Sequence, residues 1–397
     1  MNRKFVITKF NQKIFTAVLE NESIVELHCM KSEEEQNIAT LGAIYVGRVK
    51  NIVANIQAAF VEIANGVECY YSIQENPHPI FVRKMGKKPL CIGDELIVQV
   101  SKEAVKTKVP TVSSKIELAG KYAVLTSGDR RIGASMKLAR EERERLVEIA
   151  AKFSSEEYGI IMRTNAKEMS EDILEAEIEK LTLEFQKIVT NAKTRTCFSC
   201  LKKSSRQYLT ELKNMNQEGL TEFIVEDELI YEEMRNYLSE QQPEDLAKLR
   251  LYQDKLLPLH KLYSIEKHVE NALKEKVWMK SGAYLVIQPT EALTVIDVNT
   301  GKYISKKKDE KEYLKINIEA AKEAAKQIRL RNLSGIIIID FINLSTKEYM
   351  DELLEILQSE LKKDPVATSF VDITKLQLVE VTRKKIRKPF YEAYNES

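Results

Sequence analysis

Cysteine is scarce in this sequence, with five residues among 397. So few cysteines in so long a chain argue against a fold held together by disulfides. Long apolar runs are also missing, so no membrane span is predicted, and the opening stretch MNRKFVITKFNQK lacks the apolar core of a secretory signal. These absences together predict a cytoplasmic protein.

An excess of charge of one sign is missing too. The 61 Lys and Arg residues nearly balance 60 Asp and Glu, which excludes a bulk polycation. Basic residues nevertheless gather locally, at 102–115, 128–140, 301–308 and 382–390. These clusters are either solvated loops and helix faces or the lining of a groove that binds a polyanion.

What the sequence does contain is an ordinary globular composition, 44% hydrophobic and 30% charged, long enough for about two to four domains. Short alternating strands are expected within residues 1–35. From residue 42 to about residue 105, apolar alternation interrupted by Gly47 and polar turns predicts five more strands. Strands at this spacing, with aromatic residues and lysines between them, are typical of a small OB-like barrel.

Helical periodicity follows between residues 139 and 193. The stretch AREERERLVEIAAKF predicts one helix and YGIIMRT a short strand. Residues 170–193 predict a long amphipathic helix. Its apolar stripe consists of Leu174, Ile178, Leu181, Phe185 and Ile188.

The last quarter alternates strands and helices, which predicts an α/β layer. YLVIQPT and ALTVIDVN are expected to form strands, and residues 312–332 a helix. GIIIID, residues 335–340, is expected to be a strand buried on both faces. A further helix at 345–363 opens with Ser345 and Glu348, the spacing of a capping box.

Two aspartates fall at the carboxyl ends of predicted strands, Asp297 in TVIDVNTG and Asp340 in GIIIIDF. Sites in α/β layers lie outside these strand ends, and Mg²⁺ typically takes one or two protein carboxylates. Asn299 shares a face with Asp297 if the strand continues, and there it could orient a water or a phosphate. The alternative is that both aspartates only cap turns. Finding both in one layer favours Mg²⁺, and Mn²⁺ in its place is left open.

At these residues the sequence resembles the ribonuclease E/G family of endoribonucleases. The resemblance is carried by GAIYVGRVKNIVANIQAAFVEI, IIMRTNA, SGAYLVIQPTEALTVIDVNTG, NIEAAKEAAKQIRLRNLSGIIIIDFINL and LVEVTRKK, in family order across nearly the whole chain. It implies an α/β multidomain fold. Its parts would be a ribonuclease-H-like part (1–38 and 201–278), an OB-fold RNA-binding barrel (39–118), a 5′-sensor (119–200) and a deoxyribonuclease-I-like catalytic domain (279–397).

The resemblance also implies roles for single residues. Asp297 and Asp340 match the metal-binding aspartates, and Asn299 matches an asparagine that helps to position the site. Phe60 and Tyr70 match aromatic residues that stack on RNA, although Phe60 alone would be read as a barrel core residue. Lys102 and Lys108 match the RNA channel, but an arginine expected between them falls at Val105.

A 5′-phosphate sensor is implied at Arg163, Thr164 and the loop around Gly133. Guanidinium and hydroxyl groups suit phosphate binding. A further arginine of the family falls here at Ala367, which predicts weak or absent sensing.

The sequence departs from the family pattern after TRKK, where relatives carry a Cys-x-x-Cys segment that links two chains through zinc. No cysteine follows Cys200, so neither zinc nor a zinc-linked dimer is expected, and a monomer or another oligomer is left open. Cys197 and Cys200 form a lone Cys-x-x-Cys, half of a tetrahedral zinc site. The four histidines are scattered, so buried free thiols are the expected state.

The resemblance therefore implies a magnesium-dependent endoribonuclease that cleaves single-stranded RNA and leaves 5′-phosphate and 3′-hydroxyl ends, in RNA processing or decay. Two alternatives stay open. One is a catalytically inactive RNA-binding protein on the same scaffold. The other is a scaffold protein that uses the helix at 170–193 to bind a partner.

Overall fold

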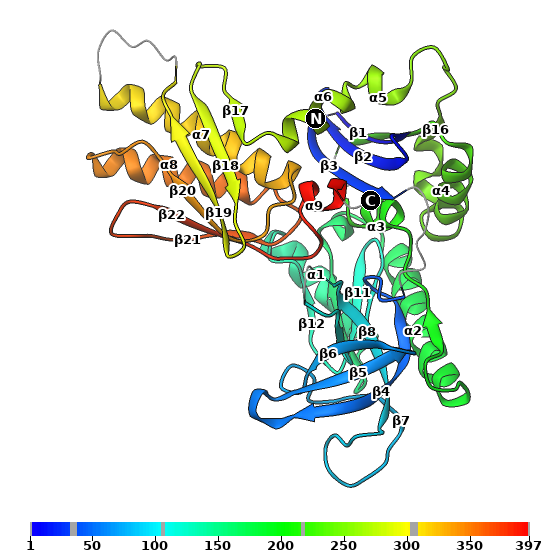
Figure 1. The fold of residues 1–397 in the computed structure, drawn as a ribbon. Helices are drawn as coiled ribbons and strands as arrows, with labels where there is room; N and C mark the ends of the chain where they lie inside the picture. Colours follow the sequence, from blue (N-terminus) through cyan, green and yellow to red (C-terminus); the bar gives the residue numbers. More distant parts are fainter. Residues whose placement is uncertain (1, 32–37, 105–107, 216–218, 302–308, 396–397) are drawn as a thin grey trace. The chain divides into compact units, whose positions relative to one another are not determined.

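The computed structural model describes residues 2–31, 38–104, 108–215, 219–301 and 309–395 (Figure 1). The chain divides into two compact units. The first combines Met1–Glu33 with Glu218–Ser397, and the second comprises Glu34–Gln217. In the described part of the chain, no helix is both long enough and apolar enough to cross a membrane.

The first sheet of the first unit joins the two distant segments of that unit. Strands β1 (Arg3–Phe10), β2 (Lys13–Glu20) and β3 (Ser23–Lys31) lie where short alternating strands are predicted, and they pair as an antiparallel meander. Strand β15 (Leu220–Val225) pairs parallel with β1, and β16 (Leu249–Leu251) pairs parallel with β15. The neighbouring helices are α4 (Glu228–Gln241), α5 (Leu259–Leu262), α6 (Ile265–Leu273) and α9 (Phe390–Asn395).

The second sheet of the first unit has six strands in the order β17-β18-β19-β20-β22-β21, and only β19 and β20 are parallel. Their bounds are β17 (Lys276–Trp278), β18 (Tyr284–Pro289), β19 (Leu293–Asn299), β20 (Gly335–Asp340), β21 (Thr368–Ile373) and β22 (Val379–Arg383). Helices α7 (Glu310–Leu330) and α8 (Lys347–Leu361) lie side by side against this sheet (Figure 1). Their apolar residues share one core with the sheet.

The helices cover one face of this sheet, as the alternation of buried and exposed residues along β20 shows. In β20, Ile337 and Ile339 are buried, whereas Ile336 is 54% exposed and Asp340 is exposed. The prediction that GIIIID is buried on both faces is therefore wrong. We call the side that carries Ile336 and Asp340 the open face.

The predicted capping box of α8 is also wrong. The N-cap is Thr346, and its side chain makes no capping hydrogen bond within the helix. Instead, Glu310 at the start of α7 accepts hydrogen bonds from the N–H groups of Ser345 and Thr346 and from the Thr346 hydroxyl. These bonds lower the pKa of Glu310. The stripe predicted for α8 is confirmed: Leu353, Leu357 and Leu361 are buried, and Met350 and Leu354 pack against the same core.

The second unit begins with a closed five-stranded barrel, as the sequence predicts for an OB-like fold. Its strands are β4 (Ile44–Val53), β5 (Ala58–Ala64), β6 (Val67–Ser72), β8 (Glu95–Lys102) and β9 (Thr111–Ser113). They follow the order β4-β5-β6-β9-β8, and the pairing of β8 with β4 closes the ring. Short strands β7 (Phe81–Arg83) and β14 (Cys200–Lys202) extend the sheet.

The rest of the second unit is a four-stranded sheet with two helices. The order is β10-β11-β13-β12, with β10 (Glu117–Ala119), β11 (Ala123–Ser127), β12 (Ile132–Ala134) and β13 (Tyr158–Met162). Helices α1 (Arg140–Ala151) and α2 (Glu171–Thr194) pack on it, and α3 (Gln207–Asn214) follows. The apolar stripe predicted for α2 is buried along its whole length.

Candidate functional site

Asp297 and Asp340 meet on adjacent strands of the six-stranded sheet. In the parallel pairing of β19 with β20, Asp297 stands directly opposite Asp340. Neighbouring strands lie about 4.8 Å apart. The residues that flank the two aspartates, Ile296, Val298 and Ile339, point into the helix-covered core. Strand alternation therefore puts both carboxylates on the open face, where Asp297 is half-buried and Asp340 is exposed.

The two carboxylates repel each other. The pKa of Asp340 is raised, mainly because burial of part of its surface disfavours the charged form and also because of the negative charge on Asp297. The Asn299 amide donates a hydrogen bond from Nδ2 to Oδ2 of Asp297, at 2.7 Å. Asn299 thus shares the face of Asp297, as its spacing predicts, and it fixes the orientation of that carboxylate.

This donor set fits a hard divalent cation. Mg²⁺ usually keeps several waters and takes one or two carboxylates together with phosphate oxygens. Among the described residues, no three His, Cys, Asp or Glu side chains are grouped so that they could hold a metal ion by themselves. A pair of carboxylates that repel each other is a site where a cation would relieve the repulsion.

A buried asparagine supports the segment after Asp340. Asn317 of α7 is fully buried, donates from Nδ2 to the Ile342 carbonyl at 2.7 Å and accepts from the Ile342 N–H at 3.0 Å. These two bonds clamp the backbone two residues beyond Asp340. Sequence reasoning missed this residue, although a polar residue on the apolar side of a predicted helix is a usable signal.

Sequence reasoning also missed three residues on the open face beside Asn299. Tyr284 of β18 stands opposite Asn299, and Trp278 of β17 stands opposite Tyr284. The Lys276 Nζ atom lies 3.5 Å from the centre of the Tyr284 ring and 4.3 Å from that of Trp278. The signal was the alternation in KVW, which places Lys276 and Trp278 on one side of a strand.

The aromatic residues of the barrel lie side by side. Phe60 of β5 stands directly opposite Tyr70 of β6, and both are half-buried. Phe60 is outside the apolar core of the barrel, which contains its neighbours Ala59 and Val61. The reading of Phe60 as a core residue is therefore wrong.

Strand pairing extends this row of residues toward a lysine. Tyr70 stands opposite Thr111, which stands opposite Lys102 of β8. Lys102 and Lys108 are exposed. The position of the expected arginine, Val105, lies outside the described residues, and so do the lysines between Lys302 and Lys308.

The residues predicted to sense a 5′-phosphate lie close together in the second unit. Gly133 of β12 stands opposite Ile161 of β13. Two residues beyond Gly133, the Ser135 hydroxyl accepts a hydrogen bond from the Thr164 hydroxyl at 3.2 Å. The Arg163 guanidinium donates to protein acceptors instead. These are the carbonyl oxygens of Gly120 (2.6 Å) and Lys213 (3.3 Å) and Oδ1 of Asn214 (3.1 Å).

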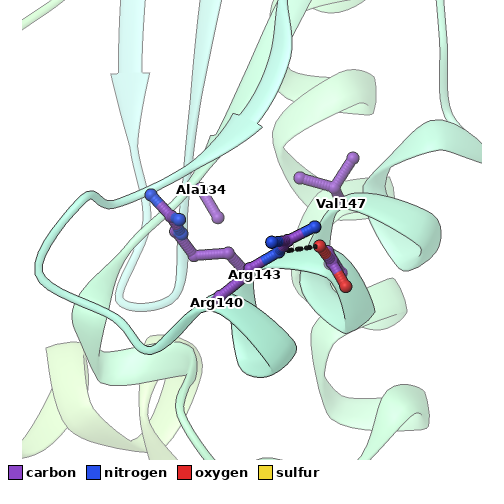
Figure 2. A pocket seen from close by; sticks show the side chains of 5 residues that line it. Ala134, Arg140, Arg143 and Val147 are labelled. Atoms are coloured by element: carbon purple, nitrogen blue, oxygen red, sulfur yellow. Dashed lines mark hydrogen bonds and ion pairs between the residues drawn. The ribbon is translucent and has the colours of Figure 1, made fainter.

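A surface pocket lies near this loop, between β12 and α1 (Figure 2). It is lined by Ala134, Arg140, Arg143, Glu144 and Val147. Arg140 pairs with Glu144 at 2.8 Å, and Nη1 of Arg143 lies 3.1 Å from the Met136 sulfur. Neither Arg163 nor Thr164 lines this pocket.

The Cys197–Cys200 segment differs from its expected state. Cys197 is half-buried and Cys200 is exposed, so the prediction of two buried thiols is wrong. Strand β14 begins at Cys200 and pairs antiparallel with β4, with the Cys200 side chain exposed.

OB-type barrels bind oligonucleotides, and metal ions serve catalysis in nucleases and polymerases. The sequence model of the Ribonuclease E/G family matches residues 117–386, and this chain belongs to that family. Ribonuclease G of Escherichia coli (strain K12) is 32% identical over 383 residues, which cover 94% of this chain and 78% of that protein. Ribonuclease G of Haemophilus influenzae is also 32% identical, over 94% of this chain and 77% of that protein. Ribonuclease E of Synechocystis sp. is 30% identical over 404 residues, 100% of this chain and 59% of that protein.

Proposed function

We propose that this protein is a magnesium-dependent endoribonuclease that cleaves single-stranded RNA and leaves 5′-phosphate and 3′-hydroxyl ends, in RNA processing or decay. The observation that carries the proposal is the register that sets Asp297 opposite Asp340 on the open face, with Asn299 bonded to Asp297. Relatives that match most of the chain and are named Ribonuclease G and Ribonuclease E support it.

The proposed architecture follows the same family. Residues 1–38 and 201–278 would form a ribonuclease-H-like part, residues 39–118 the RNA-binding barrel and residues 119–200 a 5′-sensor. Residues 279–397 would form a deoxyribonuclease-I-like catalytic domain. The closed barrel and the helix-covered six-stranded sheet support this division.

In the proposed mechanism, Asp297 and Asp340 would hold Mg²⁺, and a bound ion there would supply Lewis-acid activation of a water and stabilisation of charge on the phosphorus oxygens. The Asn299 amide keeps Asp297 oriented toward the site, and Asn317 holds the backbone after Asp340.

In the barrel, the proposed roles concern binding rather than chemistry. Phe60 and Tyr70 stack on bases, which is sequence-tolerant and selects for single strands. Lys102 and Lys108 neutralise phosphates.

The test is a cleavage assay with the purified chain and one short unstructured RNA, prepared with a 5′-phosphate and with a 5′-hydroxyl, with and without Mg²⁺. We expect cleavage of both RNAs only when Mg²⁺ is present. The preference for the 5′-phosphate is expected to be small, because Arg163 donates to protein carbonyls and Ala367 replaces an arginine.

The Asp297→Asn variant is the matched control for catalysis, since it keeps the shape of the side chain. Cleavage should disappear in this variant while RNA binding persists or tightens. Intact RNA with the wild-type chain at high concentration would refute the proposal. If wild type and variant then bound RNA equally, the alternative of an inactive RNA-binding protein would replace it.

A further inference from the structure

The single tryptophan of the chain, Trp278, is 53% exposed on the edge strand β17 of the six-stranded sheet. A single exposed apolar side chain is common on protein surfaces, but a contiguous exposed group of aromatic side chains marks an interaction site. Trp278 and Lys276 alternate with Val277, which packs toward the core, so they share the opposite side of the strand.

Trp278 belongs to a compact cluster with Tyr284 and Lys276, which we call the aromatic cluster. The rings of Trp278 and Tyr284 have centres 5.1 Å apart and are tilted by 57°. The Lys276 ammonium lies over both rings. Two aromatic rings and a cation together are the elements with which proteins hold single-stranded nucleic acid.

The strand register places this cluster next to the two carboxylates. Tyr284 stands opposite Asn299, while Lys276 stands opposite Val286, which in turn stands opposite Asp297. With strands about 4.8 Å apart, Trp278 lies about 10 Å from Asn299 across the sheet. A nucleotide adjacent or nearly adjacent to a phosphate at Asp297 could therefore reach Trp278.

The backbone holds the Tyr284 ring in place. Gly301 has φ +57°, and a Cβ atom there would lie 2.9 Å from Cδ1 of Tyr284 and 2.5 Å from the Gly282 carbonyl oxygen. The turn after Asn299 thus packs directly on this ring. Because that turn also follows the strand of Asp297, the position of the ring is tied to the position of the carboxylates.

The geometry points to the aromatic cluster as a base-stacking subsite for single-stranded RNA beside the carboxylate pair, with a nucleobase on Trp278 and a phosphate at Lys276. This inference rests on the proposed function. A cation–π contact at an exposed site is weaker than a base–aromatic stack, so Lys276 can leave the ring for a phosphate. Lys276 is positively charged, and so is the metal proposed at the carboxylate pair. These charges favour a polyanion over a purely apolar protein partner at this place.

The test uses the fluorescence of Trp278, which has no other tryptophan to obscure it. In EDTA, binding of the full chain to a fluorescein-labelled oligoadenylate is followed by anisotropy. Tryptophan emission is recorded in a parallel titration with the same oligoadenylate without the label. We expect saturable quenching of the emission at the same RNA concentrations as the rise in anisotropy. Gel analysis verifies that the RNA stays intact.

Three variants sharpen the test. Trp278→Ala should weaken binding about 5- to 150-fold, the range for loss of one stacked base, and Trp278→Phe should restore most of it. Lys276→Gln should reduce the salt dependence of binding by about 0.7 in log–log slope, as for one lost phosphate contact. Val371→Ala removes an exposed side chain from β21 at the other edge of the same sheet and should change nothing.

The outcomes separate this inference from the proposed function. Saturating anisotropy with unchanged emission would place the RNA elsewhere and overturn the inference, even if Mg²⁺-dependent cleavage is observed. Quenching without any cleavage in Mg²⁺ would refute the proposed function and leave the subsite standing. Emission that depends on protein concentration and not on RNA would mean that a second copy covers the cluster, and the absence of any RNA binding would overturn both.

Discussion

Asp340 combines surface exposure with a raised pKa, because partial desolvation and, to a smaller extent, the nearby charge of Asp297 disfavour its ionised form. For an acid, a folded-state pKa above the unfolded value means that the ionised form destabilises the fold. The destabilisation is fully present above the raised pKa and disappears as the pH falls through it toward the ordinary value of 3.8. Residues kept at the expense of stability are typical of functional sites.

The first residue-scale prediction concerns Asp340→Asn. In EDTA at neutral pH we expect the variant to melt at the same temperature as the wild type or higher, because one of two repelling charges is gone. Mg²⁺ should raise the melting temperature of the wild type and not that of the variant, since only the wild type keeps both ligands. Thermal unfolding with and without Mg²⁺ at several pH values measures both effects.

The advantage of the variant in EDTA should vanish in acid, where Asp340 of the wild type is protonated. A variant that melts well below the wild type in EDTA would instead give Asp340 a structural role. Loss of Mg²⁺-dependent cleavage should accompany the loss of Mg²⁺-dependent stabilisation.

At the residue scale, the sequence predicted what depends on short spacing and missed what depends on pairing. Asp297 and Asn299 share a face because two residues span one repeat of a strand, and the structure shows them hydrogen-bonded. Trp278 and Tyr284 come together only through the register of a hairpin. Asn317 is recognised only when its helix packs against the loop after Asp340. Local spacing can mark these residues, but it does not reveal their partners.

At the element scale, the turn after β19 carries the second prediction, Gly301→Ala. The left-handed conformation costs a side chain about 1–2 kcal/mol, and the new Cβ would also collide with the Gly282 carbonyl. We expect the melting temperature to fall. Cleavage should fall about 10- to 100-fold, because Asn299 and Tyr284 are displaced.

Gly335→Ala is the matched control for this turn. Gly335 opens β20 in the same sheet with φ +86°, but a Cβ atom there meets nothing within 4 Å. It should show the conformational cost without the collision. Equal losses of stability and activity in the two variants would mean that contact with Tyr284 and Gly282 is unimportant.

Periodicity predicts which segments form helices and strands, but it does not predict what packs against them. The stripe of α2 was assigned correctly because five apolar residues repeat at helical spacing. GIIIID was assigned to the wrong environment, because four isoleucines look the same whether one face or two are covered. The cap of α8 was missed because Glu310 comes from another helix, 36 residues before Thr346.

At the scale of the whole molecule, the proposed RNA-binding barrel and the carboxylate pair belong to different compact units. We therefore predict that Phe60→Ala weakens RNA binding about 5- to 150-fold but leaves the Mg²⁺-dependent rise in melting temperature unchanged. Anisotropy and thermal unfolding on the same preparation measure the two effects. Ile56→Ala, which removes another exposed side chain from the same barrel, serves as the control.

A change in Mg²⁺-dependent stabilisation upon Phe60→Ala would show that the barrel influences the carboxylate site. Unchanged RNA affinity would show that RNA is held elsewhere. In that second case the pair of Phe60 and Tyr70 would lose its proposed role.

The parallel pairing of β1 with β15 has a consequence for how the chain is made. Arg3 pairs with Leu220, so a ribosome that adds about 5–20 residues per second needs roughly 10–40 s to supply the partner strand. Until then, β1 is an open edge of a nascent three-stranded meander, while the intervening segment, from Glu34 to Gln217, can already fold as its own unit. A long exposed strand edge invites pairing with other chains, so this stage of synthesis is where assistance from a chaperone would matter most.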